Sequence, residues 1–268
     1  MNRRQFVGAV AAGLAVPTFA GRARSDDAPA AKGDGFGPIH HGRRPEIGML
    51  LYPGLTLMDL LGPQTVFAAA ANVHLVWKTK DEIETDTGIC MRPSATLADC
   101  PKELDALFVG GGPGQVAVMK DAEVIRFLAD RGASAKYVTS VCSGSLVLGA
   151  AGLLRGYKAT CHWAGRAALP MFGAIPVDAR VVVDRNRVTG AGVTAGLDFG
   201  LVLLAKMLGD EMAQMTQLAL EYDPAPPFQC GTPKTAGPEI TKKVAQWMGP
   251  LGARMAQVSA EAAKAMPK

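Results

Sequence analysis

From residue 46 onward, the sequence alternates between short apolar runs and longer segments with the apolar spacing of helices. Strands are predicted at 46–51, 74–79, 105–109, 137–141, 181–184 and 187–189, with the last two joined as a hairpin. Helices are predicted at 57–71, 121–133, 143–151 and 195–208, with one or two more within 238–265. Strands that alternate with helices of about 10–15 residues favour a mainly parallel sheet covered on both faces. The sequence therefore predicts one α/β domain over residues 45–268.

The composition excludes several other classes of protein. Hydrophobic residues make up 49% and charged residues 19% of the chain, so it can bury a sizeable core and is not of the disordered type. The formal net charge is only +4, without a stripe of Lys or Arg, so no nucleic-acid partner is expected. Five cysteines and four histidines show neither a disulfide framework nor the ligand spacing of a metal site, and no metal or other cofactor is expected. A Cys90–Cys100 disulfide stays open, because spacing alone cannot support it.

Residues 1–30 have the pattern of an export signal. Arg3 and Arg4 precede an apolar run over 6–19, which is shorter than the roughly 20 residues that span a bilayer. The pattern resembles a twin-arginine signal peptide, followed by a flexible linker over 31–44. This predicts the twin-arginine export machinery as a partner and a periplasmic or secreted protein. An amphipathic tail or an uncleaved anchor is the alternative.

The segment 137–146 carries the strongest chemical signal. An apolar strand runs directly into a helix of small residues, with Cys142 at the junction and Gly144 two places later. This is the pattern of a nucleophile elbow, with Cys in place of Ser. Free N–H groups and the dipole at the start of the helix stabilise negative charge, so we expect a lowered pKa for Cys142. A buried structural cysteine is the alternative.

The glycine-rich loop 110–114 does not predict a nucleotide site. Residues 112–117 and 190–195 both fit G-x-G-x-x-A. Neither segment has the acidic partner about 20 residues on, and neither carries the Lys-Ser/Thr of a phosphate loop.

Several stretches of the sequence resemble the ThiJ/PfpI superfamily and, within it, the isocyanide hydratase branch. They are 141–156 (VCSGSLVLGAAGLLRG), 57–63 (LMDLLGP), 159–163 (ATCHW), 189–199 (TGAGVTAGLDF) and 221–228 (EYDPAPPF). The similarity extends over about residues 45–235. It implies a flavodoxin-like α/β sandwich with a mainly parallel central sheet, which works as a homodimer.

The resemblance also implies a reaction. Cys142 would attack the terminal carbon of an isocyanide, R–N≡C, to give a thioimidate, and water would then release an N-substituted formamide. Asp59 would be the general acid and base, because the adduct needs a proton and the hydrolytic water must lose one. Asp59 lies in a run of Leu and Met, so we expect burial to raise its pKa. An Asp that merely stabilises the first turn of a helix is the alternative.

Four further residues take roles from the resemblance. Ser143 stands where that branch usually has Thr, and its hydroxyl can donate to the adduct or order the water. The backbone N–H groups of Gly111 and Gly112 are candidates for an oxyanion-hole-like contact with the substrate. His162 fits packing, or a place behind the catalytic groups, better than a direct role.

The function that the resemblance implies is a hydratase, which is a lyase whose substrate is a small-molecule isocyanide. Two other functions stay open. The same Cys and acid would serve another thiol enzyme of the superfamily that acts on reactive carbonyls, such as a glyoxalase or deglycase. The other alternative is a non-catalytic protein that senses a ligand or the redox state, as in regulators that join this domain to helix-turn-helix units. Only about 40 residues follow Phe228, which is short for such a pair of units, and export also argues against a regulator.

Overall fold

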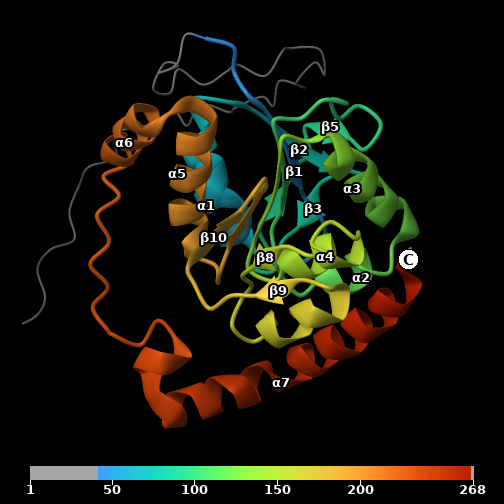
Figure 1. The fold of residues 1–268 in the computed structure, drawn as a ribbon, viewed down its shortest axis with the longest axis vertical. Coiled ribbons are helices and arrows are strands. Elements are labelled where there is room, and N and C mark those ends of the chain that lie inside the picture. Colours follow the sequence, from blue (N-terminus) through green and yellow to red (C-terminus); the bar gives the residue numbers. More distant parts are fainter. Residues whose placement is uncertain (1–41, 267–268) are drawn as a thin grey trace, which may run out of the picture. The chain divides into compact units, whose positions relative to one another are not determined.

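The structure is a computed structural model that describes residues 42–266 (Figure 1). The expected signal peptide (1–30) and the expected linker up to residue 41 lie outside the described residues. Within the described part, no helix is long and apolar enough to cross a membrane.

A seven-stranded sheet forms the centre of the fold, in the order β10-β11-β7-β6-β1-β2-β5. Its strands are β1 (Glu46–Leu50), β2 (Asn72–Trp77), β5 (Ala95–Thr96), β6 (Ala106–Val109), β7 (Tyr137–Val141), β10 (Val181–Asp184) and β11 (Arg187–Gly190). All neighbours are parallel except β10 and β11, which form the predicted hairpin around Arg185, at φ 54°. Two short pairs lie outside this sheet: β3 (Ile83–Glu84) with β4 (Cys90–Met91), and β8 (Lys158–Ala159) with β9 (Ile175–Pro176).

Helices cover both faces of the sheet, as the sequence predicts (Figure 1). They are α1 (Leu57–Ala68), α2 (Gln115–Val118), α3 (Ala122–Ser134), α4 (Gly144–Ala150), α5 (Ala195–Leu208), α6 (Asp210–Ala219) and α7 (Pro233–Ala265), with a 3-10 helix over Arg166–Phe172. Helices α1 and α5 pack together on one face, whereas α3 and α4 pack together on the other. The flavodoxin-like α/β fold is therefore confirmed.

Three helices are missing from the prediction: the short α2, the 3-10 helix over Arg166–Phe172, and α6, which only Gly209, at φ 93°, separates from α5. Helix α7 has a kink at Gly237, at φ 75°, and its longer part agrees with the helix predicted within 238–265.

The strand order reverses between β1 and β6. From β1 the chain continues to β2 on one side, and it later returns to β6 on the other. In parallel sheets, the loops at the carboxyl ends of two such strands diverge and leave a crevice where ligands bind. The loops after β1, β6 and β7 meet at this edge of the sheet.

The close approach of α4 to β6 gives a test of the fold at this edge. A Cβ on Gly144 would lie 2.1 Å from the carbonyl oxygen of Val109, which neither backbone can accommodate without a shift. We expect Gly144→Ala to lower the free energy of unfolding by about 1–3 kcal/mol or more, measured by urea denaturation. The control is Gly249→Ala on α7, where an added Cβ meets nothing within 4 Å. This variant should be as stable as the wild-type protein or more stable, by up to about 1 kcal/mol, because Ala has the higher helix propensity. Equal stability of the two variants would contradict the close approach.

Candidate active site

Cys142 lies at the turn between β7 and α4, in a backbone conformation that residues other than glycine rarely adopt. Its φ is 60°, and its N–H donates to the carbonyl oxygens of Gly190 and Ala191, at 3.1 and 2.6 Å. These carbonyls lie at the end of β11 and directly after it, so the neighbouring strand holds the turn in place. A positive φ costs free energy in a residue other than glycine and is typical of a nucleophile elbow. The side chain is 7% exposed.

Asp59 is fully buried in the first turn of α1 and faces the thiol. Its Oδ2 accepts a hydrogen bond of 2.7 Å from the N–H of Gly111, and Oδ1 has no partner among the described residues. Burial raises the pKa of Asp59 from its ordinary value of 3.8 to about 7, against the opposing effects of the Gly111 N–H and the Cys142 side chain. The expected direction is thus confirmed. The carboxyl bonds to the loop after β6 and not to the start of its own helix, which disfavours a purely helix-stabilising role.

The prediction of a lowered pKa for Cys142 is wrong. Burial, followed by the nearby charges of Asp59 and Cys161, raises the pKa of the Cys142 thiol well above 9.0. The N–H of Ser143 acts in the opposite direction but is outweighed. At neutral pH the thiol is therefore protonated, and it needs a base to become a nucleophile.

The loop after β6 approaches both groups through its backbone. The N–H of Gly111 binds Asp59, and the N–H of Gly112 donates to Ser143 Oγ at 3.3 Å. A side chain at Gly111 has no room, because its Cβ would lie 2.4 Å from Ser143 Oγ. In this structure the two N–H groups orient the acid and the hydroxyl. Their contact with a substrate oxygen or nitrogen stays a prediction.

His162 lies beside the thiol as a neutral ring. Its Nδ1 accepts a hydrogen bond of 3.2 Å from the N–H of Ala164, which leaves the ring proton on Nε2. Burial, and secondly the charge of Arg166, lower the pKa of His162. His162 therefore forms part of the wall without carrying charge.

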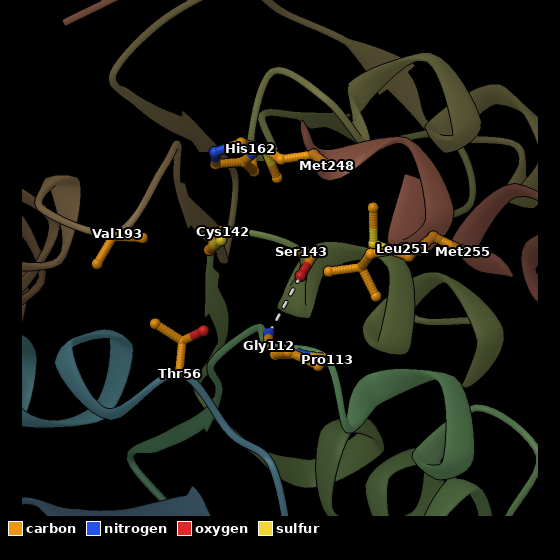
Figure 2. A pocket seen from close by; sticks show the side chains of 10 residues that line it. All are labelled: Thr56, Gly112, Pro113, Cys142, Ser143, His162, Val193, Met248, Leu251 and Met255. Carbon is orange, nitrogen blue, oxygen red and sulfur yellow. Dashed lines mark hydrogen bonds between the residues drawn. The ribbon is translucent and has the colours of Figure 1, made fainter. Parts of the chain in front are cut away.

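These groups surround a cavity of about 110 Å³ (Figure 2). It is lined by Thr56, Gly112, Pro113, Cys142, Ser143, His162, Val193, Met248, Leu251 and Met255. The fold brings together the predicted residues Cys142, Ser143, Gly112 and His162, with Asp59 and Gly111 directly behind them. The sequence alone does not identify the three α7 side chains as part of the site. An apolar helical spacing predicts that one face of a helix is buried, but it does not predict what that face covers.

The described residues contain neither a candidate metal site nor a disulfide. No group of three or more His, Cys, Asp or Glu side chains within residues 42–266 could hold a metal ion. All five cysteines are free thiols, so Cys90 and Cys100 do not form a disulfide here.

Comparisons with known proteins identify the family and several relatives. A model of the DJ-1/PfpI family matches residues 46–206. The chain is 50% identical over 193 residues to the isonitrile hydratase of Pseudomonas putida, a match that covers 71% of this chain and 84% of that protein. The crystal structure of a THiJ/PfpI family protein from Pseudomonas syringae has a TM-score of 0.79 and 47% identity, and the match covers 88% of this chain and 97% of that one. The HTH-type transcriptional regulator GbdR of Pseudomonas aeruginosa is 30% identical over 183 residues, which are 64% of this chain and 49% of the regulator.

The buried carboxyl gives a test through the pH dependence of stability. Between about pH 4 and pH 7 the folded protein keeps a proton on Asp59 that the unfolded chain has released, so its stability falls as the pH rises. The loss amounts to up to about 4 kcal/mol above pH 7. We expect Asp59→Asn to remove this loss of stability. At pH 8 the variant should therefore be more stable than the wild-type protein, as measured by urea denaturation at pH 5 and pH 8. The exposed Asp130→Asn is the control, and an unchanged pH slope in Asp59→Asn would rule out Asp59 as the titrating group.

Proposed function

The chain belongs to the DJ-1/PfpI family, and we propose that it hydrates isocyanides to N-substituted formamides. One observation carries the proposal: a buried carboxyl with a pKa of about 7 faces a thiol at a strained elbow. Such a carboxyl exchanges protons readily at neutral pH, and the thiol beside it needs a base. The 50% identity to a protein named isonitrile hydratase supports the reaction class.

In the first step, the Asp59 carboxylate takes the proton of Cys142 as Sγ attacks the terminal carbon of R–N≡C. The S–H bond breaks and the S–C bond forms. Asp59 then passes the proton to the same carbon, giving the thioimidate R–N=CH–S–Cys142 and restoring the carboxylate. The high pKa of the thiol favours this order, because no free thiolate has to persist in the buried site.

In the second step, water attacks the thioimidate carbon and gives one proton to the Asp59 carboxylate. Asp59 passes this proton to the nitrogen, so that the intermediate is R–NH–CH(OH)–S–Cys142. The C–S bond then breaks as Asp59 moves the hydroxyl proton to Sγ, which restores the thiol and the carboxylate, and R–NH–CHO leaves. Ser143 Oγ and the N–H of Gly112 lie beside Cys142 and are the groups that would hold the water or the developing charge.

Direct assay of the purified protein tests these roles. We expect formamide from an aryl isocyanide, followed by absorbance and mass spectrometry. Cys142→Ala abolishes it because no sulfur can attack, and Asp59→Asn lowers kcat by about 10²–10⁴-fold because the proton carrier is lost. Ser143→Thr keeps the hydroxyl and retains activity.

Two comparisons accompany this assay. Cys230→Ser, at an exposed cysteine, is the control and keeps full activity. Methylglyoxal is tested in parallel, because turnover of this carbonyl without any formamide would favour the carbonyl-directed alternative. Full hydratase activity in Asp59→Asn would remove Asp59 from the mechanism.

We also propose that the protein is exported through the twin-arginine pathway and acts as a homodimer. Arg3 and Arg4 before the apolar run support export. The resemblance supports the dimer, as does an apolar groove lined by Met58, Leu61, Gly62, Thr65, Leu197, Leu220 and Tyr222.

Expression of the full chain in a bacterium with a twin-arginine pathway tests both proposals. We expect a shortened chain in the periplasm, and light scattering should give a molar mass twice that of one mature chain. The double variant Arg3→Lys/Arg4→Lys is the control, since it should stay in the cytoplasm and still form dimers. Export of this variant would contradict the pathway, and a monomeric mass would contradict the dimer.

A further inference from the structure

Helix α7 turns one face towards the body of the protein over most of its length. The inward positions recur at helical spacing and are at least half-buried, and they include Val244, Met248, Leu251, Met255 and Val258. Trp247, on the outer face, is 81% exposed. The inward face packs against α2, α4 and the 3-10 helix over Arg166–Phe172.

The middle of this face closes the cavity above Cys142. Met248, Leu251 and Met255 lie together on one side of the thiol, and Figure 2 shows all three pointing into the cavity. No Asp, Glu, Lys or Arg is among the lining residues. The polar groups, such as Ser143 and His162, lie next to the sulfur, so the cavity is polar at the reacting end and apolar along α7.

Two contacts hold the C-terminal half of α7, one at the wall and one beyond it. Gln115, which is fully buried on α2, contacts the sulfur of Met255 through its amide nitrogen. Lys120, just beyond α2, forms an ion pair of 2.9 Å with Glu261. The Met255 end of the apolar wall is therefore held in place before any ligand enters, which lowers the cost of binding.

We propose that α7 binds the N-substituent of the substrate, and that Leu251 and Met248 select isocyanides with neutral, apolar substituents. The inference rests on the proposed hydratase function. An isocyanide is linear at R–N≡C, so a molecule whose terminal carbon contacts Sγ must direct R away from Cys142. A charged R would lose its hydration against Met and Leu side chains without gaining a partner. An apolar R gains contact with the wall.

Helix α7 lies beyond the segment that the family model matches. That match ends at residue 206, whereas α7 begins at Pro233. The Cys–Asp pair thus comes from the matched segment, and the proposed substituent wall comes from a helix that follows this segment in the sequence.

The test compares kcat/KM of the full chain for cyclohexyl isocyanide and methyl isocyanide. Leu251→Ala enlarges the cavity and is expected to raise the cyclohexyl/methyl ratio about ten-fold, whereas Leu251→Phe fills it and lowers the ratio about ten-fold. A general structural defect would change the cyclohexyl/methyl ratio of the two variants in the same direction. Met248→Ala and Met248→Phe repeat the pair at a second position, and Trp247→Ala is the control on the exposed face of the same helix.

A second readout does not depend on hydration. Alkylation of Cys142 by N-cyclohexyl and N-methyl iodoacetamide, followed by mass spectrometry, should shift in the same directions in the same variants. If isocyanides are not turned over but the alkylation ratio shifts, the wall stands and the hydratase proposal fails. If isocyanides are hydrated but neither ratio changes in any of the four variants, the assignment of α7 is overturned.

Discussion

The site depends on the burial of one carboxyl group beside one thiol. Removal of Asp59 from water disfavours its ionised form, and the Gly111 N–H offsets only part of that cost, which leaves the pKa at about 7. The geometry that brings the groups together needs glycine in the loop after β6. A Cβ at Gly111 would collide with Ser143 Oγ, and one at Gly144 would collide with the carbonyl oxygen of Val109. The loop, the elbow and α1 can therefore meet only with these small residues in place.

The sequence predicts the parts of this arrangement that local pattern controls. Apolar runs identify the central strands, and the elbow is visible because a strand, a cysteine and small residues follow one another without a gap. Burial of Asp59 is also predictable, since its neighbours in the sequence are Leu and Met. Helix α6 is not, because its mixed composition resembles that of a loop and its start depends on the single residue Gly209.

The error at Cys142 shows where local reasoning ends. The start of a helix stabilises a thiolate, and that effect can be inferred from the sequence. The desolvation of the thiol depends on groups that are distant in the sequence, such as Thr56, Val193 and Met248 around the cavity, and in this structure it is the larger effect. Gly111 illustrates the same limit. Its N–H is a donor at the predicted place, but the donor is occupied by Asp59, because both face the same buried space.

The placement of the site on the fold separates the reacting groups from the proposed substituent wall. Cys142, Asp59 and the glycine loop are held at the carboxyl ends of central strands, where a shift in any one strand moves the others. Helix α7 borders the cavity from outside the sheet, so its side chains can change without displacing the strands and loops that hold the Cys–Asp pair. Relatives named as a hydratase and as a transcriptional regulator share this domain. This agrees with the rule that function is determined by the site and not by the sheet that carries it. Changes in α7 alone would then alter which substituents fit beside the thiol while the Cys–Asp pair keeps its place.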